Sequence, residues 1–591
     1  MKIANIILIT LILLFSFFLR FRGIGQLEYL GDEIDDIKTS FAYAKDLNPF
    51  LQENSFTSQE MNQARLPFFL TSLFIKALPL KYLDWSSAFI LRIPFIILGV
   101  GIILLTYFMG RSLYDEKCGI LAALLLSLSS YHIGFTRIAV TSGDTMVGFF
   151  FLLSLLLFFT GIKKRNARFL LVSGFTTGLA CASKFNAGVI LLIFPVYLFI
   201  LDKTKNKILN SENNSNIDTI PSKYFTLTVI NVASVIALLV FSFLSSHKHL
   251  SHLKAHNIFL AYLVFSFAYI FSYILTLSKH RFIFAKKEFP SLFINILLTA
   301  IIITFIFSPT HIKAYNIYSM WNDLIFRSWT SDFLRQGYVI NIVLIIFIRL
   351  GIALSLLFMI GFIKSMYQYR DYSNLFVNVA TMLFLIMLFS VRNTVSWYLI
   401  PVFPLFMIVC SKQIIDMIKY YNLSRKRLLV SGILSMFIAI NLLHLEKISP
   451  CYQLDGYQYS RSLAGVNKPS FVFSEGIGET IKWLDNNLNN YTRVGFISDD
   501  QSFSLNKNHH FNRDILIYVP IYNTNKMVRY DNVYSQDKIS SYDYIISSSV
   551  YGFNWVKACS ELKLLKVISL AGLDLYEIYK VVGNGIEPSH L

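Results

Sequence analysis

Residues 92–144 read RIPFIILGVGIILLTYFMGRSLYDEKCGILAALLLSLSSYHIGFTRIAVTSGD, and this stretch already specifies the kind of fold. It holds most of two apolar runs, near 87–110 and 118–135, each long enough to cross a bilayer of about 30 Å as a helix. The short charged segment GRSLYDEK separates the two runs. The pattern therefore predicts a helical hairpin that crosses a membrane twice.

The composition of the whole chain agrees with this prediction. Of its 591 residues, 55% are hydrophobic and 15% charged, whereas soluble proteins carry about 25% charged residues. The mean hydropathy is +0.54. The first apolar run, Ile3 to Leu19, follows a lysine but lacks a small-residue cleavage site, so we interpret it as a retained first span.

Hydropathy predicts a polytopic α-helical membrane protein with about 13 transmembrane helices. The predicted spans lie near 3–19, 87–110, 118–135, 144–162, 169–183, 185–202, 224–245, 257–278, 290–308, 338–361, 374–391, 398–416 and 428–445. Lysine and arginine collect in every second connection, so the positive-inside rule predicts a cytoplasmic N-terminus and an external C-terminus. Arg20, Arg22 and Arg137 are exceptions, because they fall on the predicted outside.

The net charge of +18 needs no nucleic acid as a partner. Most of the excess lies on predicted cytoplasmic loops, where it faces anionic lipid. The chain is thus expected in a cell membrane as a multi-pass protein, with membrane lipid as its surroundings.

The composition changes at residue 446, which divides the chain into a membrane domain, 1–445, and a C-terminal segment, 446–591. The segments TRVGFISDD, DILIYVPIY, YDYIISSSV and LDLYEIYK read as strands, and ETIKWLDNNLNN reads as a short amphipathic helix. We therefore predict a soluble α/β domain outside the membrane. Its two cysteines, Cys451 and Cys559, would allow a disulfide in an oxidising compartment.

Carboxylates cluster in QLEYLGDEIDD, within the predicted first external loop, 20–86: Glu28, Asp32, Glu33, Asp35 and Asp36. On a helix, Asp32, Asp35 and Asp36 would share one face and repel one another. A solvated loop is one explanation. Basic residues at span ends on the same predicted side favour a functional one, and these are Arg65, Arg137, Lys184 and Arg392.

Four stretches carry a resemblance to a known family. The Asp-Glu pair in the first external loop, residues 92–144 and GFTTGLACASKFNAGVILLIFP, followed by WYLIPVFPLF, resemble the membrane-embedded GT-C glycosyltransferases. The nearest groups are the protein O-mannosyltransferases and the aminoarabinose transferases that modify lipid A. The resemblance covers residues 1–200 well and the WYLIPVFPLF region fairly, and the remainder matches only in layout.

The resemblance implies an inverting transfer from a polyprenyl-phosphate sugar donor to a hydroxyl acceptor on the external face. Asp32 is the implied general base, with Glu33 beside it. The leaving lipid phosphate needs cations, which we assign to Arg137 and Lys184, with Arg65 and Arg392 behind them. In the family an arginine is followed several residues later by an aspartate, which here corresponds to Asp144.

Each of these assignments has a simpler alternative. Arg137 could be an interfacial anchor or form an ion pair with Asp144, and Lys184 could snorkel at the outer boundary. Gly174 and Gly178 are spaced for close helix packing without a catalytic role. Tyr398 could contact substrate or belong to an aromatic belt.

Two further segments are candidates for binding. The predicted external loop 309–337 interleaves aromatic and charged residues as an amphipathic cover for the site; its candidates for substrate contact are His311, Trp321, Asp323 and Arg327. The segment SSHKHLSHLKAHN holds His247, His249, His252 and His256, the last two one helical turn apart. A divalent metal could bind there, but a polar external hairpin is the simpler explanation, and the resemblance implies no metal for transfer.

The sequence thus predicts a polyprenyl-phosphate-sugar-dependent glycosyltransferase, with the sugar, the length of the lipid carrier and the acceptor left open among protein, lipid and glycan. Two alternatives stay open. A polytopic transporter or flippase should show internal repeats and ionisable residues at mid-membrane depth, and no clear repeat is present. A non-catalytic GT-C scaffold is the other alternative.

Overall fold

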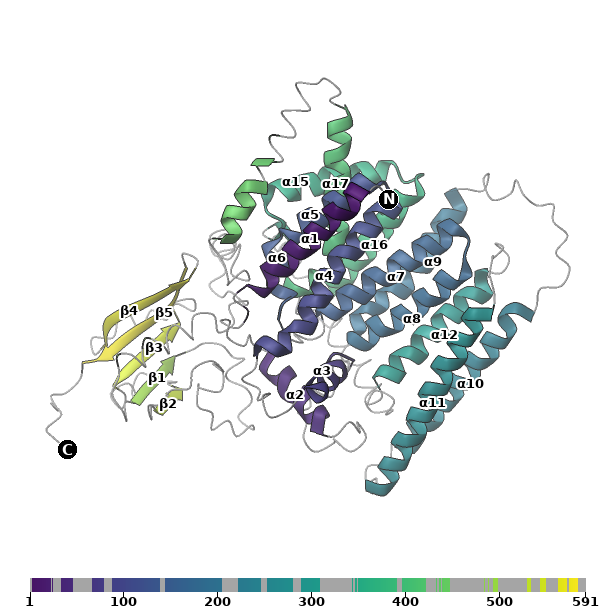
Figure 1. Ribbon diagram of the computed structural model, residues 1–591, viewed down its shortest axis with the longest axis horizontal. Coiled ribbons are helices and arrows are strands. Elements are labelled where there is room, and N and C mark those ends of the chain that lie inside the picture. Colours follow the sequence, from purple (N-terminus) through teal and green to yellow (C-terminus); the bar gives the residue numbers. More distant parts are fainter. Residues whose placement is uncertain are drawn as a thin grey trace.

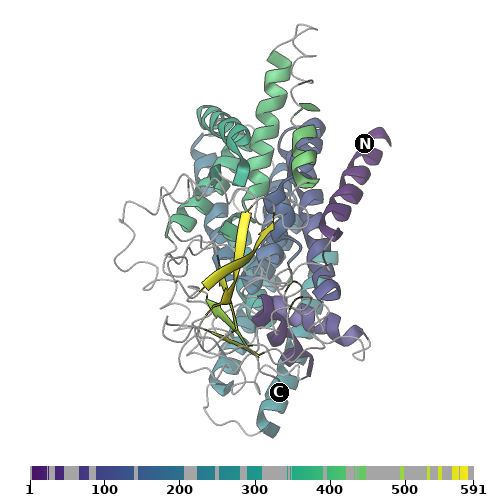
Figure 2. The ribbon, with the colours of Figure 1, turned by 90° about the vertical axis from the view of Figure 1, so that its left-hand side faces the viewer.

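The computed structural model consists of a helical bundle and a separate β-sheet (Figures 1 and 2). Apart from a few single residues, the stretches it describes are 3–22, 33–45, 66–78, 88–138, 144–204, 222–245, 252–279, 289–308, 349–390, 396–420, 438–446, 493–497, 529–532, 543–548, 562–570 and 573–582. Every structural statement below concerns these residues.

The helices follow the apolar runs of the sequence. They are α1 (Ile3–Phe21), α2 (Glu33–Lys45), α3 (Leu66–Ala77), α4 (Ala88–Leu113), α5 (Glu116–Ser127), α6 (Ser130–Phe135), α7 (Asp144–Lys164), α8 (Ala167–Ser183), α9 (Ile190–Thr204), α10 (Ser222–Ser245), α11 (His252–Lys279), α12 (Phe289–Phe307), α15 (Ile352–Tyr367), α16 (Tyr372–Ser390) and α17 (Phe403–Tyr420). Short 3₁₀ turns, η5 (Phe185–Val189) and η10 (Ser396–Leu399), precede α9 and α17.

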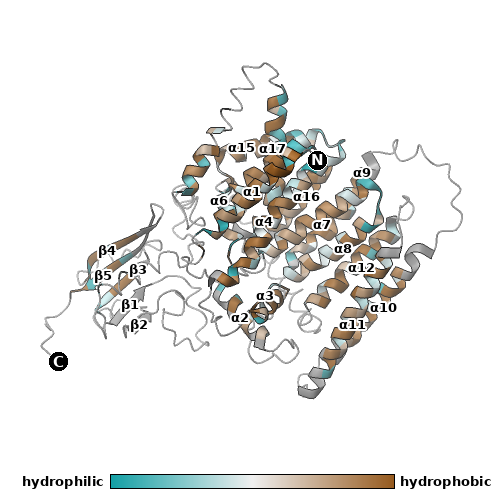
Figure 3. Ribbon diagram, viewed as in Figure 1, coloured by the Kyte–Doolittle hydropathy of each residue, from teal (hydrophilic) through white to brown (hydrophobic). Residues whose placement is uncertain are grey.

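Several helices have the character of membrane spans. Their residues are hydrophobic along most of their length (Figure 3). Among the described residues, 5 helices are long and apolar enough to cross a bilayer: Ile3–Phe21, Ile90–Leu113, Asp144–Lys164, Leu260–Leu277 and Pro290–Phe307. This supports a membrane protein, while the number of spans and their orientation stay predictions.

Two predicted elements differ from the structure. The predicted span 118–135 is broken into α5 and α6, because the Ser129 hydroxyl accepts a hydrogen bond from the His132 N–H and starts a new helix. The predicted first external loop also contains helices, α2 and α3. Both segments can form helices, but the residue at which each helix starts depends on capping and packing, which hydropathy does not report.

Close contacts between helices depend on glycine. A Cβ on Gly174 would lie 2.8 Å from the backbone oxygen of Ile296, and one on Gly178 would lie 2.7 Å from that of Ala300. The prediction that these glycines allow close packing is confirmed, and the partner is α12. α7 packs on the same α8, and α4 packs on α7. These contacts fix the ends of α4, α7 and α8 relative to one another.

The C-terminal strands form one sheet in the order β2-β1-β3-β5-β4. The strands are β1 (Arg493–Ile497), β2 (Arg529–Asn532), β3 (Tyr544–Ser548), β4 (Leu562–Leu570) and β5 (Leu573–Val581). β1 pairs in parallel with β2 and β3, and β5 is antiparallel to β3 and β4. The strands predicted in TRVGFISDD, YDYIISSSV and LDLYEIYK are present, β2 and β4 were missed, and DILIYVPIY lies outside the described residues.

Candidate functional site

Three residues far apart in the chain meet at one end of the bundle. Lys184 donates hydrogen bonds from Nζ to both carboxylate oxygens of Asp144, at 2.9 and 2.8 Å. The same ammonium lies 4.0 Å from the centre of the Tyr398 ring, within range of a cation–π contact. The side chain of Asp144 is 2% exposed and that of Lys184 is 17% exposed. Lys184 is therefore a positioned cation that keeps part of its surface accessible.

Helix ends place these three side chains. α7 begins at Asp144, where an acidic residue interacts favourably with the helix dipole. α8 ends at Ser183, and Lys184 caps it in an extended conformation while its N–H donates to the Ala180 oxygen. Tyr398 lies in the 3₁₀ turn before α17. Because α7 and α8 form an antiparallel pair with a short connection, the start of one lies beside the end of the other.

A buried ion pair holds the start of α2. Arg92 of α4 donates from Nε and Nη2 to the two carboxylate oxygens of Glu33, at 2.8 and 2.7 Å. Its Nη1 also donates to the Ile24 oxygen at 2.9 Å. Both side chains are fully buried. Glu33, predicted as a catalytic residue, therefore presents both of its oxygens to Arg92, an arrangement that positions the chain directly after Asp32.

A second arginine, Arg20, joins the end of α1 to α6. Its Nε donates to Oγ1 of Thr136 at 2.9 Å, and its Nη2 donates to Nδ1 of His132 at 2.6 Å. Arg137, which follows Thr136 in the chain, donates from Nη1 to the backbone oxygen of Arg22 at 3.2 Å. Arg20 and Arg137 are both fully buried. Arg137 thus lies inside the protein, unlike a snorkelling interfacial anchor.

The arginines that violated the positive-inside pattern are therefore used in tertiary contacts. Arg20 and Arg137 are hydrogen-bonded as described, and Arg22 forms a two-pronged ion pair with Glu446. The guanidinium of Arg22 lowers the pKa of the Glu446 carboxyl, which lies beyond the last predicted span. This pair links the end of α1 to the first residue of the predicted C-terminal segment.

The described charges at this end of the bundle favour an anion. The cations are Arg20, Arg92, Arg137 and Lys184, and the buried carboxylates are Glu33, Asp36 and Asp144. Arg349 adds a further cation over the rings of Tyr131 and Phe135, 5.7 Å from each ring centre. A site with excess positive charge and little water can stabilise a developing phosphate charge.

The structure brings together Asp144, Lys184 and Tyr398, and places Arg137 and Glu33 in the neighbouring buried contacts. Other predicted site residues lie outside the described part of the chain: Asp32, Arg65, Arg392, His311, Asp323 and Arg327. Sequence reasoning missed Arg20, Arg92 and Arg349. The available signal was a charged residue at the end of an apolar run or inside one, as Arg349 is in the predicted span 338–361, because such a charge is costly unless it is paired.

A metal site was considered at the histidine-rich segment. Within the described residues, no group of three or more histidine, cysteine, aspartate or glutamate side chains could hold a metal ion. His247 and His249 lie outside those residues. His252 and His256 belong to α11, but the structure does not describe their side chains. The prediction about a metal is therefore not tested.

Comparison with known proteins confirms the resemblance. Residues 70–213 match the family model of dolichyl-phosphate-mannose-protein mannosyltransferases. The matched segment contains Arg92, Arg137, Asp144 and Lys184. No curated protein matches the chain by sequence.

Two solved structures match most of the chain. The archaeal oligosaccharyltransferase AglB from Archaeoglobus fulgidus, solved with an inhibitory peptide and a dolichol-phosphate, is 14% identical with a TM-score of 0.46; the match covers 93% of this chain and 69% of AglB. ArnT from Cupriavidus metallidurans, bound to undecaprenyl phosphate, is 11% identical with a TM-score of 0.46, and the match covers 98% of both chains.

Proposed function

We propose that the protein is an inverting glycosyltransferase of the GT-C type, which moves a monosaccharide from a polyprenyl-phosphate donor to a hydroxyl acceptor at the external membrane face. The observation that carries the proposal is the Lys184–Asp144–Tyr398 contact. It sets a partly exposed cation at the end of a helical bundle, and two of its three residues fall within the segment that matches the mannosyltransferase model.

The transfer requires a proton acceptor and a stabilised leaving group. Asp32 takes the proton of the acceptor hydroxyl while that oxygen attacks the anomeric carbon. The bond from this carbon to the phosphate oxygen breaks, and the configuration inverts. Negative charge grows on the lipid phosphate, and the partly exposed Lys184 ammonium is assigned to stabilise it.

The neighbouring residues have supporting roles in this proposal. Arg137 contributes positive potential from its buried position, and Arg65 and Arg392 are assigned to the same phosphate. The Glu33–Arg92 pair holds the first turn of α2, and Asp32 directly precedes that turn in the sequence. His311, Asp323 and Arg327 are assigned to substrate contact. No metal takes part in these steps.

The experiment that tests the proposal measures transfer from radiolabelled polyprenyl-phosphate sugars in membranes that contain wild type, Asp32→Asn or the matched control Asp543→Asn. Asp543 is exposed and precedes β3. We expect label to move to a new acceptor with wild type and the control, and not with Asp32→Asn. Equal transfer by folded Asp32→Asn would contradict the assigned base.

A transporter or flippase is the alternative that the many apolar helices allow. Reconstituted protein that takes up or flips a lipid-linked sugar without forming a covalent product would favour it. Folded protein that does neither, with every donor tested, would favour the scaffold. The role of 446–591 in acceptor choice is testable by deletion of 450–591, after which an unchanged acceptor range would remove that role.

A further inference from the structure

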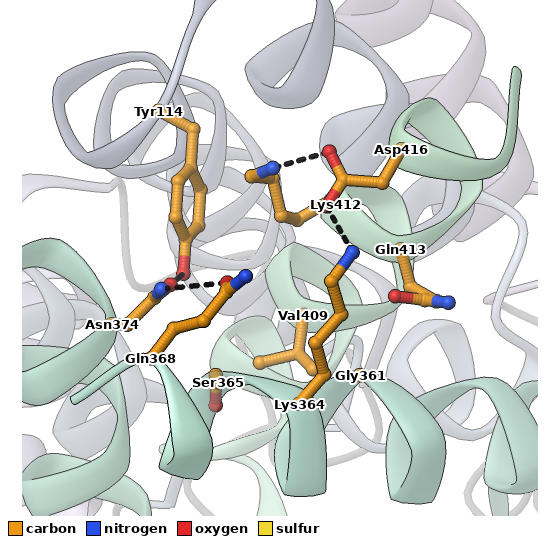
Figure 4. Close-up of a pocket in the computed structure, with 10 residues that line it drawn as sticks. All are labelled: Tyr114, Gly361, Lys364, Ser365, Gln368, Asn374, Val409, Lys412, Gln413 and Asp416. Carbon is orange, nitrogen blue, oxygen red and sulfur yellow. Dashed lines mark hydrogen bonds and ion pairs between the residues drawn. The ribbon is translucent and has the colours of Figure 1, made fainter. Parts of the chain in front are cut away.

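A polar pocket lies between the ends of α15, α16 and α17 and the turn that follows α4 (Figure 4). Its polar lining includes Tyr114, Lys364, Gln368, Asn374, Lys412 and Asp416. The cavity measures about 20 Å³, which is room for about one water molecule. A larger ligand would therefore lie at the mouth and extend one polar group inward.

The pocket contains more cations than anions. Lys364 donates to Oδ2 of Asp416 at 2.8 Å, and Lys412 donates to Oδ1 of the same carboxylate. The side chains are 40% exposed for Lys364, 32% for Lys412 and 20% for Asp416. An ammonium has three N–H donors and no acceptor. Two ammonium groups that share one carboxylate leave a positive charge and donors for a second anion.

The neutral side chains of the pocket also supply a donor. The Tyr114 hydroxyl donates to Oδ1 of Asn374 at 2.8 Å, and Nδ2 of Asn374 donates to Oε1 of Gln368 at 3.4 Å. These hydrogen bonds use the side-chain oxygen of Gln368 as an acceptor. The amide nitrogen of Gln368 can therefore donate to a ligand. Figure 4 shows this nitrogen on the side that faces Lys364.

The pocket lies on the membrane side opposite to the candidate site. Arg92 is near the start of α4, and Tyr114 follows its end. At 1.5 Å per residue, these positions are about 33 Å apart along the helix, which is about the thickness of the hydrocarbon core. The pocket therefore lies at the level of the lipid headgroups of the other leaflet.

The surroundings fit a lipid more closely than a soluble anion. Ile360 and Ile363, in the turn before Lys364, are 55% and 48% exposed and offer apolar surface to acyl chains. Lys163 at the end of α7 donates to the Ser112 oxygen, which places further basic residues at the same level. Basic pockets between membrane helices are known to bind anionic headgroups.

We propose that this pocket binds the phosphate of an anionic phospholipid, with Lys364, Lys412 and Gln368 as its donors. The site is separate from the proposed transfer site and does not depend on that activity. Asp416 competes with the phosphate for both ammonium groups, and it therefore lowers the affinity of the pocket for the lipid.

The test titrates short-chain phosphatidylglycerol into purified protein in neutral detergent and counts bound lipid by native mass spectrometry. We expect K364Q/K412Q to weaken binding by about 25-fold, from about 5-fold for each charge. The control K117Q/K164Q removes two exposed lysines of the same membrane side outside the pocket. It should bind as wild type does.

Asp416→Asn separates binding from stability. This variant removes both ion pairs, yet we expect it to bind the lipid more tightly, since both ammonium groups are freed. Weaker or unchanged binding by Asp416→Asn would overturn the proposal, as would equal affinity of wild type and K364Q/K412Q. Glycerol phosphate that binds as tightly as the lipid would identify a soluble phosphate instead, and the lipid proposal would fail.

Discussion

The buried pair of Glu33 and Arg92 allows a quantitative test of how the protein holds helix α2. Both side chains are fully buried, and Arg92 makes three hydrogen bonds that Arg92→Met removes. Opposite charges about 4 Å apart attract by about 4 kcal/mol at an effective dielectric constant of 20. Breaking a buried pair from one side costs about 3–5 kcal/mol, because the remaining charge stays buried without its partner. We expect Arg92→Met to lower the free energy of unfolding by this amount.

The same substitution should cost much less when the carboxylate is absent. In a Glu33→Gln background the remaining group is a neutral amide, so Arg92→Met should cost about 1–2 kcal/mol. Denaturant titration in mixed micelles of wild type, both single variants and the double variant gives a coupling energy, which we expect to be about 2–3 kcal/mol. A coupling below about 0.5 kcal/mol would refute the reasoning, since sites without a shared contact add within that margin. Lys117→Met, at an exposed position, serves as the control and should change stability by no more than about 0.5 kcal/mol.

Two further predictions concern the transfer site and the helix packing. Lys184→Met should reduce sugar transfer by about 100-fold or more, since the loss of one group that stabilises developing charge has this effect. Lys184→Arg should keep more activity than Lys184→Met. Equal transfer rates for wild type and both variants would contradict the role assigned to Lys184. Gly178→Val should lower the free energy of unfolding by about 1–3 kcal/mol through overpacking against α12, whereas Gly188→Ala, where a Cβ meets nothing within 4 Å, should not. Thermal unfolding in detergent compares these two variants, and similar losses would contradict the packing.

Much of the membrane domain follows from local properties of the chain. A run such as Ile3 to Leu19 is apolar over the full thickness of a bilayer, so its helical state and its location depend on composition alone. Gly174 and Gly178 predicted a close contact by their spacing, although the spacing could not name α12 as the partner. Strand β4 was missed because its residues, LKLLKVISL, carry lysines and leucines without the strict alternation that marks a half-buried strand.

The candidate site was predicted as a set of charged span ends, and its pairings were not. Arg137 was the partner considered for Asp144, and the structure shows an ion pair of the Asp144 carboxylate with Lys184, 40 positions away, that was not predicted. Glu33 was assigned beside the base without a partner, and the structure gives it Arg92, 59 positions away. Such pairs depend on which helix ends lie side by side, and this is a property of the packed bundle.

The sequence by itself determined that the chain is a helical membrane protein, which residues end its apolar runs, and that its family resemblance lies in the N-terminal third. Hydropathy and local motifs decide these features, because a long apolar helix satisfies its own backbone hydrogen bonds and needs no partner to be stable in lipid. Only the tertiary structure decided which charges meet. A charged side chain in low dielectric is stable where an opposite charge or a donor reaches it. The close packing of α7 and α8 brings Lys184 to Asp144, and the position of α2, which packs on α3, brings Glu33 to Arg92 of α4.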